Sequence, residues 1–527
     1  MSKISWRKRL VTLGLVFWLA VGMLGSALRA SSSHASPPPE GRQTPQVVGE
    51  APRTPSPAPT TTGAAPQHGR GYVPPPVDLS HLAGCWRPGA QLASVPSEER
   101  WDWRDQGVVT RVQDQGDCGS CYAFATLATL ESQLLMAGEG TYDLSENHAA
   151  FCNYEALNVE DLGGCHGGSM WMATNLYSTH GAVLESCDPY TYDYETCHTT
   201  CPFTKTVTEM WALAGGMPPE EALKSWLYDY GPLYVAMDSG GYDAWGLEFN
   251  HYTPLHTPYY TLDHPMDDPQ PNHAVLLVGW DDTLASGKGG WIVKNSWGTS
   301  WGFACGYGSE GGYFTITYGS AGIGSAASLI AGWQDYDPDG SLLYLDEAGL
   351  QAAFGGSGTK QAWGLVRLTP GRYGSATQVE IWTDDATTDV DVYIYDDFTY
   401  VDSDDNAASG LLWSSEDNAF DYAGYHSIAI QPSLPITAGD DINVMVKVQN
   451  AVYDYPLALD SLGPPAGENQ SFASATGEDD SWDDYGSYGY DVGIRLRVVL
   501  SPTVTLYLPV VLKEWAPGEP SVTPTPP

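Results

Sequence analysis

The sequence predicts two folded domains, an α+β domain followed by an all-β antiparallel sandwich. At 527 residues the chain is too long for one ordinary domain. Before about Gly324, residues at helical spacing, as after Cys121 and over Glu220–Tyr230, alternate with short apolar runs such as Leu233–Met237. After Gly324 the pattern changes to short alternating runs bounded by Gly, Pro, Asp and Asn, which predict strands and turns. These runs are Ala362–Leu368, Gln378–Trp382, Val390–Tyr395, His426–Ile430, Ile442–Val448 and Val492–Val499.

The composition is strongly acidic, with 23 Lys and Arg residues against 64 Asp and Glu residues and a formal net charge of −41. A chain with this charge repels a phosphate backbone, so we expect no nucleic-acid partner. The acidic residues are dispersed, with a higher density near residues 384–405. This distribution indicates a solvated surface rather than a dedicated cation site.

Residues 1–30 predict a secretory signal peptide, because a basic start precedes an uncharged apolar run, Leu10–Leu28, and small residues. The run also has the length of a membrane span, so an uncleaved N-terminal anchor is the alternative. Residues 31–78 are rich in Pro, Ser, Thr and Ala and predict an extended disordered linker. In the C-terminal tail, residues 501–527, the apolar run at 501–512 is too short to span a membrane. We therefore expect no membrane span once the signal is removed.

The most informative stretch is Gln115–Phe124, in which Cys118 and Cys121 are three residues apart. That spacing occurs in redox pairs and in half of a zinc site. The residues after Cys121, however, recur at helical spacing and predict a buried helix that begins near this cysteine. A thiol at a helix N-terminus meets the positive end of the helix dipole, which favours the thiolate. Cys121 is therefore a candidate nucleophile.

A thiolate nucleophile needs a base, and the base needs an orienting group. His273 stands at the start of an apolar run that predicts a buried strand, and Asn295 follows another such run. The imidazole of His273 would take the thiol proton and later give it to the leaving amine. This chemistry requires no metal and no organic cofactor.

The segments around Cys121, His273 and Asn295 together resemble the papain-like cysteine proteases. The resemblance implies a two-lobed α+β domain over residues 79–322, with a helical lobe and a β-barrel lobe. It also implies that the side-chain amide of Gln115 and the backbone N–H of the nucleophile stabilise the oxyanion of the transition state. The catalytic residues would then be Cys121, His273, Asn295 and Gln115.

The resemblance also assigns residues to the substrate cleft. A glycine pair would let a substrate backbone approach closely. The next two residues would line the pocket for the second residue before the cut, with two alanines across the cleft. A tryptophan would shield the hydrogen bond between His and Asn from water. These residues are Gly167, Gly168, Ser169, Met170, Ala236, Ala274 and Trp297.

Nine cysteines suit an oxidising compartment, and the odd total leaves one thiol for catalysis. The resemblance implies two disulfides, and two further pairings are guesses. The pairs are Cys118–Cys165 and Cys152–Cys197 from the resemblance, Cys187–Cys201 as a reasonable third, and Cys85–Cys305 by elimination.

Two stretches contain metal-ligating residue types, and we expect a metal at neither. Residues 240–271 are rich in Tyr, His, Pro and Asp, but their spacing matches no ligand template. They predict a solvent-facing inserted loop, with a lid near the cleft as the alternative. The stretch Asp335–Asp346 imitates a calcium loop but lacks the bidentate Glu and convincing flanking helices.

Residues 325–500 resemble the lectin-like domain attached to some bacterial cell-surface papain-like proteases. A glycan or other cell-surface ligand is one hypothesis for this domain, and a structural role beside the protease is the alternative. The chain is thus predicted to be a secreted or cell-surface cysteine endopeptidase that hydrolyses peptide or protein substrates through a thioester. The alternatives are a surface adhesin with an inactive protease scaffold and a thiol transpeptidase. No helical pro-region is evident, so any inhibitory role falls to Gly71–Glu99.

Overall fold

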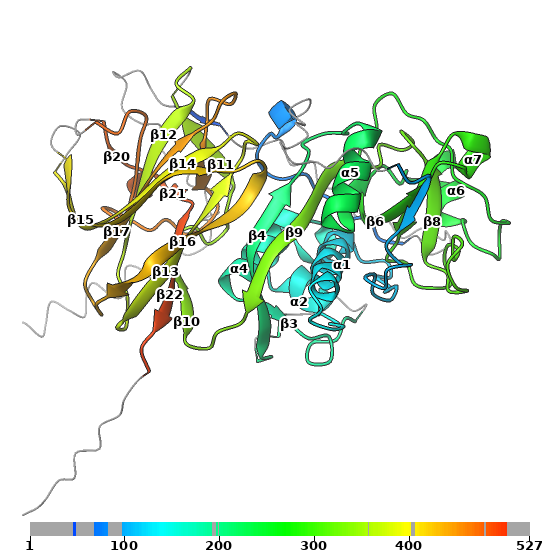
Figure 1. Cartoon of the computed structure of the whole chain (residues 1–527), viewed down its shortest axis with the longest axis horizontal. Coiled ribbons are helices and arrows are strands. Elements are labelled where there is room, and N and C mark those ends of the chain that lie inside the picture. The colour runs from blue at the N-terminus through cyan, green and yellow to red at the C-terminus, as the bar shows by residue number, and fades with distance from the viewer. Residues whose placement is uncertain are drawn as a thin grey trace, which may run out of the picture. The chain divides into compact units, whose positions relative to one another are not determined.

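The computed structural model describes residues 46–48, 68–82, 97–191, 197–198, 200–356, 358–401, 406–478 and 481–502. Every described α-helix belongs to the first domain, and the C-terminal domain is built from strands (Figure 1). None of the described helices is both long and apolar enough to cross a membrane. The α-helices are α1 Cys121–Met136, α2 Glu146–Phe151, α3 Tyr154–Asn158, α4 Met170–Thr179, α5 Glu220–Tyr230, α6 Ala244–Asn250 and α7 Leu284–Gly287. The 3-10 helices are η1 Ser80–Leu82, η2 Gly164–His166 and η3 Gly486–Tyr488.

The strands fall into two groups along the chain. Those of the first domain are β2 Arg100–Asp102, β3 Ala182–Val183, β4 Phe203–Ala212, β5 Leu233–Met237, β6 His273–Asp281, β7 Gly290–Lys294, β8 Tyr313–Thr317 and β9 Ser325–Asp335. Those of the C-terminal domain are β10 Gly340–Leu343, β11 Ala352–Gly355, β12 Gln361–Leu368, β13 Gly374–Thr383, β14 Asp389–Tyr400, β15 Asn406–Ala419, β16 Ala423–Ile436, β17 Ile442–Gln449, β18 Leu457–Asp460, β19 Ser471–Ser474, β20 Asp483–Asp484, β21 Asp491–Val492 and β22 Ile494–Leu500. The short strand β1 Gln46–Val48 pairs with β11.

The first domain contains the helix that the sequence predicts at Cys121. The apolar side chains of Leu127, Leu130 and Leu134 are buried along α1, which packs against β5, β6 and β9. The helix predicted at Glu220–Tyr230 and the strand at Leu233–Met237 have those bounds in the structure, as α5 and β5.

The C-terminal domain is an antiparallel β-sandwich. One face is the six-stranded sheet β15-β14-β17-β12-β19-β20, and the other contains β10, β22, β13 and β16. Alternate residues of β12, β14 and β17 point inward, as the period of two in the sequence predicts, and they form one apolar core with β13, β16 and β22. The prediction of an α+β domain followed by a β-sandwich is confirmed.

One sheet continues from the first domain into the second. Its strand order is β10-β22-β13-β16-β4-β9-β5-β6-β7-β8, and the two domains join where β16 pairs with β4. At this junction Ala423 lies opposite Ala212, and Tyr425 lies opposite Met210. Strand β9 pairs with β4 and β5, so its residues belong to the sheet of the first domain, whereas the sequence analysis starts the second domain at residue 325.

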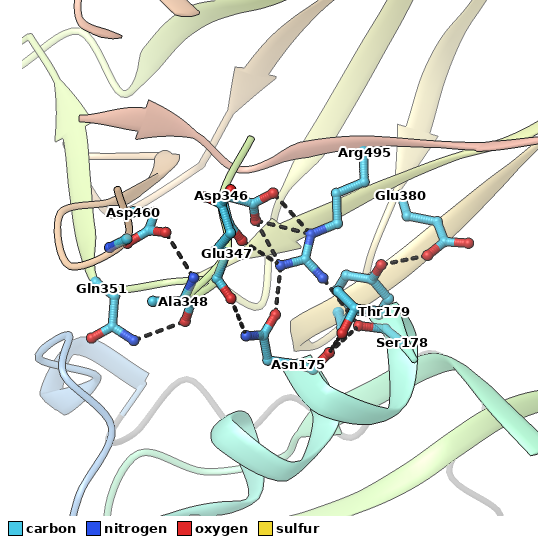
Figure 2. A network of polar contacts seen from close by, with 12 residues as sticks. Asn175, Ser178, Thr179, Asp346, Glu347, Ala348, Gln351, Glu380, Asp460 and Arg495 are labelled. Atoms are coloured by element: carbon cyan, nitrogen blue, oxygen red, sulfur yellow. Dashed lines mark hydrogen bonds and ion pairs between the residues drawn. The ribbon is translucent and has the colours of Figure 1, made fainter. Parts of the chain in front are cut away.

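A buried polar network fastens the C-terminal domain to helix α4 (Figure 2). Arg495 on β22 forms an ion pair with Asp346 at 2.8 Å, and both side chains are fully buried. The same guanidinium donates to Asn175 Oδ1 at 2.6 Å and to Ser178 Oγ at 3.0 Å, both on α4. Asp346, one end of the stretch that imitates a calcium loop, therefore serves this domain contact.

Two segments differ from the expected loops. The sequence predicts a disordered linker over residues 31–78, but two parts of it are ordered. Strand β1 pairs with β11, and residues 68–78 include backbone hydrogen bonds with the first domain. Within 240–271, Phe249 and Tyr252 are fully buried, so the inserted segment is anchored in the core rather than facing solvent throughout. The expected signal peptide and most of the C-terminal tail lie outside the described residues.

Candidate functional site: a thiol, an imidazole and two amides

Cys121 is the first residue of α1 and is completely buried. The N-terminal end of the helix points its free N–H groups and its positive dipole at the thiol. Strand β6 lies opposite, and the backbone N–H of Ala274 is 3.4 Å from Sγ. Ala274 directly follows His273, so the thiol contacts β6 one residue away from the candidate base.

His273 has the hydrogen bond that a general base requires. Its Nε2 lies 2.8 Å from Oδ1 of Asn295, so Nε2 carries the proton and donates. Its Nδ1 is buried and has no hydrogen-bond partner among the described residues. The ring of Trp297 lies 4.9 Å away, centroid to centroid, and covers the pair. This tautomer leaves Nδ1 free to accept a proton from the thiol.

The side-chain amide of Gln115 is held rigidly near the nucleophile. Its Nε2 donates to the carbonyl oxygen of Cys118 at 2.8 Å and to that of Gly69 at 3.0 Å. Its Oε1 accepts from Ser296 Oγ at 2.5 Å. The sequence analysis did not identify Ser296, although its place directly after Asn295 was a usable signal. The contact with Gly69 shows that the amide already binds a peptide carbonyl.

Residues 68–73 occupy the cleft above these groups. Gly168 donates its N–H to the carbonyl of Gly71, and Val73 donates to the carbonyl of Gly168, both at 2.9 Å. The N–H of Gly71 donates to Cys121. At the other end the ring of His68 stacks on Trp297 at 4.6 Å. The segment therefore covers the site from the tryptophan to the glycine pair.

The direction of this segment is unproductive. In a substrate, the residues that precede the cut are expected at Gly167 and Gly168, and the carbonyl of the bond that is cut is expected at the Gln115 amide. In the covering segment, the carbonyl at that amide belongs to Gly69. In the structure the residue beside Gly168 is Tyr72, which comes after Gly69 in the chain. The covering segment contacts the thiol through the backbone N–H of Gly71, which donates a hydrogen bond to it. The segment thus resembles a substrate in its contacts but runs backwards.

The glycine pair, Gly167 and Gly168, lies so close to the covering segment and to the core that neither position has room for a side chain. Gly167 has φ +104°, which favours glycine, and an added Cβ would lie 2.9 Å from the carbonyl oxygen of Gly71. At Gly168 a Cβ would lie 2.8 Å from the side chains of Tyr122 and Met172. A side chain at either position would push the bound backbone or the core apart.

The pocket residues are only partly brought together. Ser169 and Met170 line a groove of about 730 Å³ beside the cleft, together with Tyr234 and Pro271. Ala236 and Ala274 face each other across β5 and β6 and are fully buried, and neither lines this groove. On strand β5, the groove is lined by the ring of Tyr234 rather than by Ala236.

The Cys121 thiol and the His273 imidazole are both uncharged in the covered site. Burial raises the pKa of the Cys121 thiol to about 11, and hydrogen bonds from the N–H groups of Ala274 and Gly71 only partly oppose it. Burial lowers the pKa of His273 to about 3, against the opposing hydrogen bond with Asn295. At neutral pH the pair is therefore thiol and neutral imidazole.

This state has a measurable consequence. In the full-length chain, the Cys121 thiolate is expected to form only as the pH approaches about 11. Its ultraviolet absorbance is measured as the difference between the wild type and Cys121→Ala. The pKa of the thiol is raised because burial disfavours the charged thiolate. After residues 68–73 leave the cleft, the same signal is expected at neutral pH. A thiolate signal at pH 7 in the intact chain would contradict the covered geometry.

The structure contains three disulfides around the helical lobe: Cys118–Cys165, Cys152–Cys197 and Cys187–Cys201. The first ties the loop before Cys121 to the segment before the glycine pair. Cys305 is a buried thiol without a disulfide partner among the described residues, so its pairing with Cys85 stays a guess. Cys85 lies outside the described residues.

Comparison with known proteins places both domains in families. Residues 97–331 match the model of the papain family cysteine protease, and residues 343–496 match that of the lectin like domain. Cysteine proteinase A of Leishmania mexicana is 34% identical over 225 residues, which are 42% of this chain and 55% of the relative. The chain thus spans little more than half the length of that relative.

Solved structures share the two-domain fold. The cysteine protease and lectin-like domains of Cwp84, a surface layer associated protein of Clostridium difficile, align with a TM-score of 0.62 at 20% identity. That match covers 82% of this chain and 93% of the other. Clostridial Cwp84 after propeptide cleavage aligns with a TM-score of 0.60 at 21% identity, over 76% of this chain and 99% of the other. The chain thus contains a papain-family cysteine protease domain, residues 97–331, followed by a lectin-like domain, residues 343–496.

Proposed function

We propose that this protein is an exported cysteine endopeptidase that hydrolyses peptide bonds and is held latent by residues 68–73. The convergence of Cys121, His273, Asn295 and Gln115 on one cleft carries the proposal. Asn295 orients the imidazole of His273, and the Cys121 thiol contacts the next residue of the same strand. This arrangement supports an enzyme rather than an inactive scaffold.

The reaction begins when His273 Nδ1 takes the proton of Cys121 and the sulfur attacks the substrate carbonyl carbon. The carbonyl oxygen becomes an oxyanion, which accepts hydrogen bonds from Gln115 Nε2 and the backbone N–H of Cys121. The imidazolium then protonates the departing amine, which leaves a thioester on the sulfur. Water, deprotonated by His273, hydrolyses the thioester and restores the thiol. Asn295 holds the ring in the useful tautomer at each step.

Latency follows from the reversed segment, which occupies the cleft and contacts the thiol through the backbone N–H of Gly71. Displacement or cleavage of this segment would open the cleft. The form of Cwp84 described after propeptide cleavage supports an activation of this kind. Three disulfides, the predicted signal peptide and the surface-layer relative support a secreted or cell-surface location.

The test is peptidase activity after the cleft has been opened. The full-length chain is treated with a serine protease, which is then inhibited, and is assayed with a fluorogenic dipeptide amide that has an apolar penultimate residue. Gln115→Ala is expected to lower kcat about 10²- to 10³-fold, because it removes one oxyanion donor. Cys121→Ala, treated identically, should be silent.

Equal activity of the wild type and Cys121→Ala, or none in either, would refute the proposal. Products that carry an added amine in place of water would assign the same thioester to a transpeptidase.

A further inference from the structure

The groove beside the cleft does not end in the first domain. It begins at Ser169 and Met170, where the residues of a substrate before the cut are expected, and it reaches Tyr453 of the C-terminal domain. The ring of Trp171 at the start of α4 stacks on Trp382 of β13 at 5.6 Å. The wall of the groove is therefore continuous across the domain junction.

A side chain of residues 68–82, His81, lies beside the end of this groove at Tyr453. The imidazole of His81 stacks on the ring of Tyr453 at 4.0 Å with 6° between the planes. Its Nε2 lies 2.8 Å from the carbonyl oxygen of Asp384 and 3.8 Å from Oδ2 of Asp385. Its Nδ1 lies 3.2 Å from the carbonyl oxygen of Asp78. Both of these contacts are with carbonyl oxygens, which only accept hydrogen bonds, so this place around the ring favours N–H donors.

Two buried acidic residues, Asp384 and Asp385, lie next to the ring of His81. Asp384 and Asp385 are 1% and 2% exposed, and Oδ2 of each has no hydrogen-bond partner among the described residues. Thr387 fixes Asp385 through its N–H at 2.7 Å and its hydroxyl at 2.6 Å, both to Oδ1, which leaves Oδ2 toward His81. Burial and the neighbouring Asp385 raise the pKa of Asp384. A cation in this place would oppose that rise and pair with the free oxygen of Asp385, and the nearby ring of Tyr453 also attracts a cation.

We propose that Tyr453, Asp384 and Asp385 form a binding site for a cationic side chain of the substrate, on the part of the peptide before the cut. His81 fills this site in the latent enzyme, and release of residues 68–82 opens it. The inference rests on the proposed peptidase function, because it assigns the substrate a basic residue at a distance from the bond that is cut. The C-terminal domain then extends the substrate cleft.

The experiment uses the full-length chain opened by the serine protease treatment, with active sites counted by a thiol-directed epoxide. Peptides with one fixed cleavage point carry a single Lys at each position from the third to the tenth before the cut, in an otherwise Ala background. One position is expected to raise kcat/KM about 10- to 100-fold over the all-Ala peptide, the range for a hydrogen bond to a charged group. Asp385→Asn and Tyr453→Ala should remove this gain and leave the dipeptide amide unaffected.

Asp440→Asn, which changes an exposed carboxylate of the same domain, is the matched control and should keep the gain. A Lys series without a preferred position overturns the inference. The inference is also overturned if Asp385→Asn and Tyr453→Ala change only the rate at which the full-length chain becomes active. The site would then bind His81 in the latent enzyme but no side chain of the substrate. If the dipeptide amide itself is not cleaved, the proposed function has failed rather than this site.

Discussion

Replacing Gly71 with leucine in the full-length chain is expected to raise its basal peptidase activity about 10- to 100-fold. A Cβ at this position would overlap the carbonyl group of Gly119, which is backbone beside the nucleophile and cannot move aside. Overpacking of this kind costs about 1–3 kcal/mol, and that cost falls on the covered state alone because the displaced segment makes no such contact. The open state becomes correspondingly more populated. The readout is hydrolysis of the dipeptide amide without protease treatment.

Gly371→Leu is the matched control, because a Cβ there meets no atom within 4 Å, and it should leave the chain latent. Adding Cys121→Ala to Gly71→Leu should abolish the new activity and so assign it to this thiol. A Gly71→Leu chain that melts like the wild type yet stays silent would show that residues 68–73 do not restrain the enzyme.

The elements that carry the candidate catalytic residues could be predicted because each depends on a short local pattern. A helix begins at Cys121, and apolar runs place His273 at the start of one strand and Asn295 just after another, and each pattern can be read within about ten residues. The cleft segment was not predictable in this way. Its order comes from backbone hydrogen bonds at Gly71 and from ring stacking by His81, and neither leaves a periodic signal in a Pro-rich stretch.

The domain junction was missed for a related reason. The strand predicted at Val492–Val499 is present as β21 and β22, but its alternating arginines suggest a side facing solvent. Arg495 and Arg497 instead face α4, where both donate to Ser178. Their acidic partners, Asp346 and Glu380, come from more than a hundred residues earlier in the chain. Pairing over such distances depends on how the two domains join, which strand patterns alone do not specify.

Replacing Arg495 with methionine is expected to lower the free energy of unfolding by about 3–5 kcal/mol, the usual cost of breaking a buried ion pair. The guanidinium is fully buried, and its loss leaves the Asp346 carboxylate without its charge partner and removes the hydrogen bonds to Asn175 and Ser178 (Figure 2). Differential scanning calorimetry of the full-length chain measures the change. Arg111→Met, at an exposed pair with Asp143, should cost less than about 1 kcal/mol.

The pH dependence of this deficit identifies its cause. Burial already raises the pKa of Asp346 to about 6 despite Arg495, so the folded state holds this proton more tightly than the unfolded chain does. A carboxyl group with a raised pKa favours folding when it is protonated, and this contribution is lost as the pH rises through the folded pKa. Without Arg495 that pKa rises further, so the deficit of the variant relative to the wild type should be largest at pH 7 and should shrink toward pH 4. The double variant Arg495→Met/Asp346→Leu should recover most of the stability at pH 7, because no unpaired charge stays buried. A deficit that is the same at both pH values would instead mean that the lost contacts with α4, rather than the stranded carboxylate, dominate the cost.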